Sequence, residues 1–109
     1  MSKIFDVAAL DWQTVRPDVA RQVFGKTLLD GQVKAVLTRV APGGKFKMHR
    51  DAYAHLFYFV SGQGIVQVGD QQSVAHAGSV VQVDAGDLHS YENTGTEDLV
   101  LLSLNIPTQ

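Results

Sequence analysis

The feature that most restricts the fold of this chain is a series of short runs rich in Val, Ile, Leu, Phe and Tyr that begins near residue 22. Turns that contain Gly and Asp separate these runs, and no stretch presents an obvious helical face. Closely spaced short strands are typical of an all-β sandwich or barrel, and periodicity alone leaves both open. We predict strands over 21–28, 33–41, 46–50, 55–60, 64–68, 71–76, 79–83, 88–93 and 99–106, with turns at 41–44, 61–64 and 69–70.

The length of 109 residues predicts a single domain over 1–109, in which 1–20 form a weakly patterned N-terminal arm. A net charge of −2 argues against a nucleic-acid partner. The chain has no cysteine, which excludes disulfides and thiolate metal sites. Any transition-metal site must therefore use imidazole, carboxylate or water.

The start of the chain lacks the apolar core and small-residue cleavage site of a secretory signal peptide. The most apolar stretch, 99–104, is far too short to span a bilayer. We therefore expect a cytoplasmic protein with no membrane partner.

Three of the four histidines and one aspartate lie in two short stretches, "HRDAYAH" at 49–55 and "AGDLHSYEN" at 85–93. In a strand, His49, Asp51 and His55 have the same parity and would share a face. An unbroken strand would nevertheless hold His49 and His55 roughly 20 Å apart, too far to bind one ion. Convergence on a metal therefore requires a bend between Asp51 and Ala54, and the alternative is a set of unrelated histidines on a β surface.

Glycines, histidines and an asparagine in these stretches match the two sequence motifs of the cupin family, and in this respect the chain resembles a single-domain cupin. The resemblance implies a double-stranded β-helix, the jelly-roll β-barrel, over 33–106, with a ligand cavity open at one end. The first motif is matched at Gly43, His49 and Gly62, and the second at Gly78, Gly86, His89 and Asn93.

Three positions differ from the family pattern. Asp51 stands where the pattern has its second histidine, His55 stands where it has glutamate, and Asp84 replaces a proline. The inventory of three histidines and one carboxylate is unchanged. The resemblance thus implies that His49, Asp51, His55 and His89 hold a divalent transition metal such as Fe, Mn, Ni or Zn. Two versions stay open: Asp51 binds the metal directly, or the three histidines bind it and Asp51 orients an imidazole.

We expect a small-molecule substrate, and two reaction classes fit such a site: dioxygenation, and isomerisation of a sugar or keto acid. No organic cofactor site is expected. Phe57, Phe59 and Tyr91 share parity with the histidines and are expected to line the cavity, where Tyr91 is the candidate catalytic acid. The alternatives are a non-catalytic cupin for sensing or storage and, least favoured, a structural remnant without metal.

Two further sites are interpreted as surface features. His76 is expected to be an exposed histidine at a strand end. Arg39 is the nearest candidate for a clamp on a substrate carboxylate, although a surface position is favoured.

Two strands allow predictions about which side chains face inward. In "KFKMHR", Lys45 and Lys47 are expected to face solvent while Phe46 and Met48 face inward. The strand at 99–104 is apolar on both faces, which predicts burial by a second subunit and hence a homodimer.

Overall fold

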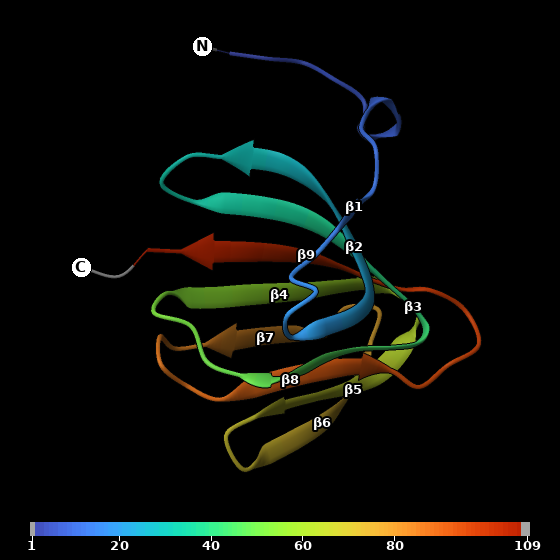
Figure 1. The fold of residues 1–109 in the computed structure, drawn as a ribbon, viewed down its shortest axis with the longest axis vertical. Coiled ribbons are helices and arrows are strands. Elements are labelled where there is room, and N and C mark those ends of the chain that lie inside the picture. The colour runs from blue at the N-terminus through green and yellow to red at the C-terminus, as the bar shows by residue number, and fades with distance from the viewer. Residues whose placement is uncertain (1, 108–109) are drawn as a thin grey trace.

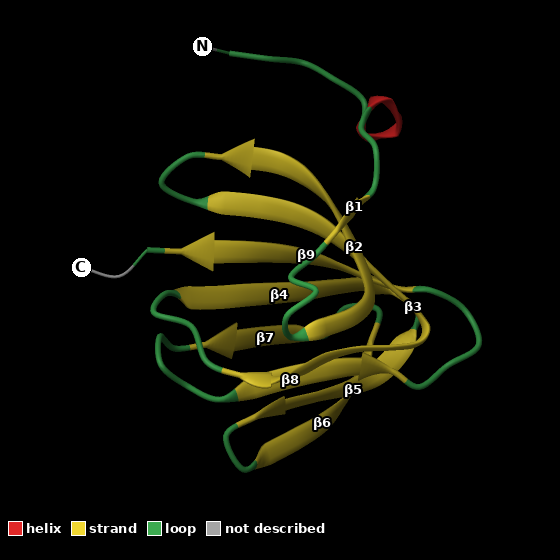
Figure 2. Cartoon of the chain, viewed as in Figure 1, coloured by secondary structure: helices red, strands yellow, loops and turns green. Residues whose placement is uncertain are grey.

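The computed structural model describes residues 2–107, which form a curled antiparallel sheet with one short 3₁₀ helix, η1 (Val7–Ala9) (Figures 1 and 2). The main sheet runs in the order β6-β5-β8-β3-β9-β4-β7, and β2 pairs with β3 while β1 pairs with β2. The strands are β1 (Gln13–Thr14), β2 (Ala20–Asp30), β3 (Lys34–His49), β4 (Ala54–Ser61), β5 (Gln63–Val68), β6 (Gln71–His76), β7 (Val80–Val83), β8 (His89–Asn93) and β9 (Leu99–Ile106).

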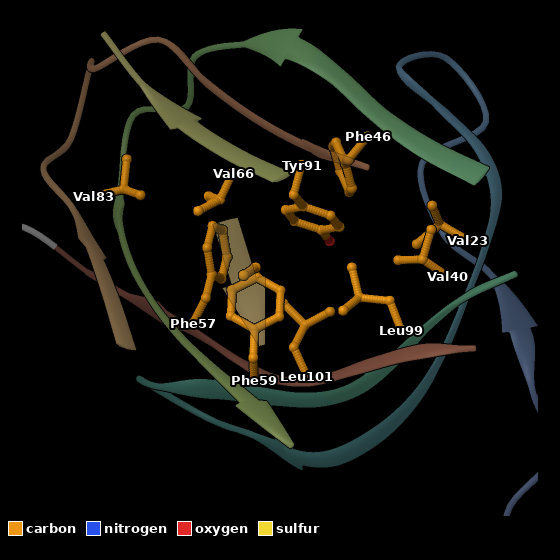
Figure 3. Close-up of a cluster of buried hydrophobic side chains, with 11 residues drawn as sticks. Val23, Val40, Phe46, Phe57, Phe59, Val66, Val83, Tyr91, Leu99 and Leu101 are labelled. Carbon is orange, nitrogen blue, oxygen red and sulfur yellow. The ribbon is translucent and has the colours of Figure 1, made fainter. Parts of the chain in front are cut away.

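The expected all-β jelly-roll class is confirmed, because the sheet curls around a single core (Figure 3). Apolar side chains from strands on all sides of the curl fill this core. They are Val23, Val40, Phe46, Phe57, Phe59, Val66, Ala75, Val83, Tyr91, Leu99 and Leu101.

The predicted turn at 41–44 is wrong, because β3 continues through it as one long strand. The first part of β3, up to Val40, pairs with β9, and the part from Lys45 onward pairs with β8. Gly43 has a φ of 79°, a left-handed conformation that favours glycine. The Gly-rich segment is therefore the place where β3 changes neighbours, and β3 links the two parts of the sheet.

The N-terminal arm projects from the barrel and then folds back along it (Figure 1). The Trp12 ring lies under two cations, the guanidinium carbon of Arg39 at 4.6 Å and Lys26 Nζ at 4.7 Å from its centroid. Arg39 also lies over the Phe24 ring. Arg39 is thus held in a cation–π cluster with the arm. It is not among the residues that line the cavity described below, so the suggested role as a carboxylate clamp has no support there.

The strand β9 is apolar on both faces, as predicted. Leu99 and Leu101 are fully buried in the core, while Val100, Leu102 and Leu104 remain partly exposed on the outer face. On the same outer face, Tyr58 of β4 pairs with Leu102 on one side and with Val80 of β7 on the other.

Candidate metal centre

A β-bulge brings His49 into the interior. Phe46 pairs with Tyr91 and His49 pairs with His89, so three steps along β3 match two steps along β8. The extra residue places His49 on the same side as Phe46, and their rings stack with centroids 4.6 Å apart. Met48 is turned outward and is 40% exposed, so the expectation that it faces inward is wrong.

The chain bends between His49 and His55, as the metal hypothesis requires. β3 ends at His49, a connection of four residues follows, and β4 begins at Ala54. His55 then lies directly opposite Asn105 of β9. This bend returns the chain to the same end of the barrel, where Asp51 enters the interior from the connection with only 8% of its side chain exposed.

The three histidines and Asp51 come together. Asp51 Oδ2 lies 2.9 Å from His55 Nε2, 3.1 Å from His49 Nε2 and 3.7 Å from His89 Nε2. Ligand atoms of His49, Asp51 and His89 all lie within 4.8 Å of one another, which makes these three a possible metal-binding group. His55 is outside that group, although its Nε2 is the nearest of the three to Asp51 Oδ2.

The other nitrogen of each imidazole faces an oxygen acceptor. His49 Nδ1 lies 2.6 Å from the carbonyl oxygen of Lys47, and His89 Nδ1 lies 2.9 Å from that of Asp87. His55 Nδ1 lies 3.0 Å from Asn105 Oδ1. Because these oxygens only accept, the ring proton of a neutral imidazole belongs on Nδ1, which leaves a lone pair on Nε2.

If all three imidazoles are neutral in this tautomer, three lone pairs and a carboxylate meet with no proton between them, and the hydrogen bond of 2.9 Å between His55 Nε2 and Asp51 Oδ2 forms only when a proton is added. Such an arrangement is repulsive unless a cation lies among the donors, either protons on the imidazoles or a metal ion. Imidazole with Nδ1 fixed by a carbonyl or amide oxygen is also the usual form of a metal-bound histidine. The donor set thus fits a first-row divalent metal.

The surroundings shift the pKa values of two members of this group. Burial alone would raise the pKa of Asp51, but hydrogen bonds from His55 and Arg16 and the nearby histidines outweigh it, so the pKa is lowered. Burial lowers the pKa of His89 despite its hydrogen bond to the carbonyl of Asp87. Both shifts favour the forms that bind metal, an ionised carboxylate and a neutral imidazole.

The group forms one end of a cavity of about 350 Å³, which is large enough for a small organic molecule. Two cations, Arg16 and Lys34, line it together with Asp51. Polar side chains of β1, β2, β3 and β9 and aromatic rings complete the lining; among them are Gln13, Thr14, Thr27, Thr38, Ser103, Asn105, Tyr53, Phe57 and Tyr91.

The predicted lining is confirmed in part. Phe57 and Tyr91 line the cavity, whereas Phe59 is fully buried in the core away from it. Burial raises the pKa of Tyr91 far above that of a free phenol, so Tyr91 remains protonated at neutral pH. Asn93 holds the 93–98 turn against β3, because its Nδ2 donates to the carbonyls of Val40 and Glu97.

Two expectations about surface residues are also resolved. His76 is an exposed residue at the end of β6, as predicted. The predicted tight turn at Gly69-Asp70 connects β5 and β6, and Gly69 has a φ of 56°.

Sequence reasoning missed Arg16, Lys34 and Asn105. Lys34 and Asn105 face one another across β3 and β9. The sequence carries a signal for Asn105, because Ser103 and Asn105 interrupt an apolar strand at alternating positions. Arg16 carries no such signal, because its segment has no periodic pattern.

A family model for the cupin domain matches residues 36–105. In sequence, the chain is 30% identical over 69 residues to the oxalate-binding protein of Thermotoga maritima, a match that covers 62% of this chain. The chain spans 57% of the length of that relative.

Solved structures share the fold. A predicted oxalate decarboxylase from Thermotoga maritima superposes with a TM-score of 0.88 at 21% identity, covering 97% of this chain and 100% of that one. The polyketide cyclase RemF from Streptomyces resistomycificus gives a TM-score of 0.87 at 17% identity, covering 100% of this chain and 81% of that one. KdgF from Halomonas sp. gives a TM-score of 0.83 at 18% identity, covering 100% of this chain and 96% of that one.

Among the described residues 2–107, no helix is long and apolar enough to cross a membrane. The family model spans well over half of the chain and includes both stretches that carry the histidines. The protein therefore belongs to the cupin family.

Proposed function

We propose that the protein is a small metal-dependent cupin that acts on a small polar organic compound. The observation that carries the proposal is the meeting of three Nε2 atoms around Asp51 Oδ2. A divalent transition metal such as Fe, Mn, Ni or Zn would be held by His49, His55 and His89. Asp51 is either a fourth ligand or the group that orients an imidazole.

A bound metal of this kind supplies a Lewis acid and a template for a chelating substrate. The residues around it bind, orient and exchange protons. Tyr91 faces the cavity with its phenol protonated, so it can donate a hydrogen bond and is unsuited to act as a base at neutral pH. The raised pKa also makes it a weak acid, so Tyr91 is the candidate hydrogen-bond donor to the substrate in either dioxygenase-type or isomerase-type chemistry.

The charges of the cavity favour an organic acid as substrate. Among the described side chains that line it, Lys34 forms no ion pair, although Asp30 lies directly opposite on β2. Lys34 faces Asn105, which faces His55 in turn, so two strand spacings of roughly 5 Å each separate Lys34 from the histidine. A substrate with one end at the metal and an acidic group at Lys34 fits this arrangement. The relative from Thermotoga maritima is named for binding oxalate, which is a small dicarboxylate.

A non-catalytic cupin that binds a metal or a small ligand is the second candidate. It is supported by the name of the same relative, which describes binding and not a reaction. Asp51 and His55 also differ from the ligand types of the family pattern, and a changed ligand set suits a metal centre that binds a ligand without catalysing a reaction.

The proposal includes a homodimer. It is supported by the partly exposed apolar outer face of β9 and the neighbouring Tyr58 and Val80, which are 46% and 58% exposed. Sedimentation of the purified protein tests this, and a monomer at micromolar concentration would contradict it. A cytoplasmic location also stays a prediction, which cell fractionation would test.

The deciding experiment is elemental analysis of protein purified without a histidine tag. We expect stoichiometric metal, either as purified or after addition of Fe, Mn, Ni or Zn. Metal that stays substoichiometric in all four cases would overturn the proposal. Oxygen uptake by the loaded protein with catechols, keto acids and thiols, followed by product analysis, then separates an oxygenase from an isomerase and both from a binding protein.

Asp51→Ala separates the two versions of the centre. Unchanged metal affinity would exclude direct ligation by Asp51, whereas a loss larger than about 100-fold favours it, because orienting groups are worth about 10- to 100-fold.

A further inference from the structure

Arg16 lies on the N-terminal segment, outside residues 36–105 that the cupin model matches. Pairing of β1 with β2 and a hydrogen bond from Val15 N to the carbonyl of Val23 fix this segment against the barrel. Gly25 makes the close approach possible, because a Cβ there would lie 2.9 Å from Val15 Cγ2 and 2.7 Å from Val36 Cγ1. The segment is therefore packed firmly against the barrel, and its residues 13–16 line the cavity next to the candidate metal centre.

The backbone of Arg16 is held in a conformation that an L-residue rarely adopts, with a φ of 39°. Its carbonyl accepts hydrogen bonds from Val19 N at 2.9 Å and Ala20 N at 2.8 Å, which close a turn around this strained residue. Strain of this kind is unfavourable and persists only where other contacts maintain it. The turn aims the side chain back toward the cavity.

The guanidinium of Arg16 joins two carboxylates. Nη1 donates to Asp51 Oδ1 at 3.2 Å, while Nε and Nη2 donate to the two oxygens of Asp18 at 3.4 and 3.3 Å. The two oxygens of Asp51 therefore have different partners: Oδ1 accepts a hydrogen bond from Arg16, and Oδ2 faces the three imidazoles. This division matters because the terminal torsion of an aspartate is soft, and one oxygen must be fixed to aim the other.

We propose that Arg16 is a positioning residue of the metal centre, holding Asp51 by one oxygen so that the other faces the histidines. The inference rests on the proposed metal-binding function. It also accounts for an aspartate at a position where the family pattern has histidine, because only an anion there can pair with an arginine. The ion pair between Arg16 and Asp51 is thus a departure from the family pattern. Arg16 itself lies outside the residues that the cupin model matches.

An ordinary surface ion pair is the competing explanation, since 40% of the Arg16 side chain is exposed. A surface pair changes stability slightly and leaves metal affinity alone. A positioning residue changes metal affinity and the geometry of the ligand field, so these two quantities separate the explanations.

The test measures Co²⁺ and Zn²⁺ affinity by chelator competition, together with the visible absorption spectrum of the Co²⁺ protein, for wild type, Arg16→Met and Arg16→Lys. We expect Arg16→Met to weaken binding by about 10- to 100-fold and to alter the Co²⁺ spectrum. Arg16→Lys should restore part of the affinity. Arg21→Met is the matched control, because Arg21 is exposed and its guanidinium hydrogen-bonds only to the carbonyl of Gly43 among the described residues. It should leave both quantities unchanged.

Asp51→His, which restores the family residue, gives a second test that does not depend on a single variant folding. In that background Arg16→Met should have no further effect on metal affinity, because the carboxylate it positions is gone. The inference is overturned by wild-type affinity and spectrum in Arg16→Met, by an equal loss in Arg21→Met, or by an equal loss in the Asp51→His background. A wild type that takes up no metal would instead overturn the proposed function, and this inference with it.

Discussion

The inner faces of β3, β4 and β9 are apolar at one end of the barrel and polar at the other. At the apolar end, the inward side chains are fully buried; they are Val40, Phe59, Leu99 and Leu101. At the polar end, inward positions on the same strands line the cavity; they include Lys34, Thr38, His55, Ser103 and Asn105. One set of strands thus serves as core over part of its length and as binding wall over the rest.

The difference shows that the pairing of the strands does not depend on whether their inward side chains are apolar or polar. Strand pairing is continuous along β9, which pairs with β3 from Leu99 to Asn105 without interruption. Burying Leu99 and Leu101 stabilises the fold by removing apolar area from water. Burying His55 and Asn105 gives no comparable stabilisation, because each buried polar atom must find a hydrogen-bond partner to replace water. A polar end of this sort indicates a function beyond folding.

The largest expected effect is at the apolar end. Phe59→Ala should lower the free energy of unfolding by about 3–5 kcal/mol, because Phe59 is fully buried and its removal leaves a cavity. Urea denaturation measures this. Val60→Ala, next in sequence but 46% exposed, is the control and should change stability by less than about 1 kcal/mol. Equal effects of the two substitutions would contradict the assignment of this end as core.

The next largest effect is at the polar end, on metal binding. His89→Gln should lower divalent metal affinity by at least about 100-fold, because it removes an imidazole whose Nε2 faces the centre. Isothermal titration with Zn²⁺ measures the affinity. His76→Gln alters an exposed histidine on β6 and serves as control. Metal affinity that is unchanged in His89→Gln would exclude this histidine as a ligand.

A smaller effect is expected on the preference among organic acids. Metal-loaded protein should bind malate about tenfold more tightly than 2-hydroxybutyrate, since the two differ in the carboxylate that would meet Lys34. Lys34→Met should abolish this preference, whereas Lys47→Met, exposed on the same strand, should retain it. A preference that survives in Lys34→Met would assign the recognition of the second carboxylate to another group.

The smallest effect concerns the pH dependence of stability in the metal-free protein. The pKa of His89 is lowered in the folded state, so the unfolded chain binds a proton first as the pH falls below the ordinary value of 6.5. Stability should therefore decrease with acidification from that value down to the lowered pKa. The pKa of Asp51 is lowered from 3.8, so its contribution is lost only below that value. Urea midpoints between pH 8 and 4 measure the first loss, and His89→Gln should reduce it.

The sequence was sufficient for most of the strands and for the cupin family, because alternating apolar residues and glycine turns are local signals. The bend between Asp51 and Ala54 followed only from the requirement that His49 and His55 meet at one metal, and the short strand β1 was not predicted. It failed at 41–44, where glycines and proline suggested a turn and pairing with two neighbours instead kept β3 continuous. It failed at Met48 because a bulge is a property of two paired strands. Arg16 was missed because its role depends on a contact with Asp51, 35 residues away in the chain.

The bulge in β3 has a consequence for insertions and deletions. Three residues from Phe46 to His49 face two from Tyr91 to His89, so a chain shortened by one residue at Met48 would pair in regular register. The histidine would still stand opposite His89 and on the same face as Phe46. A deletion, usually the most damaging change within a strand, is thus compatible here with the ligand arrangement, while a one-residue insertion at the same point is not.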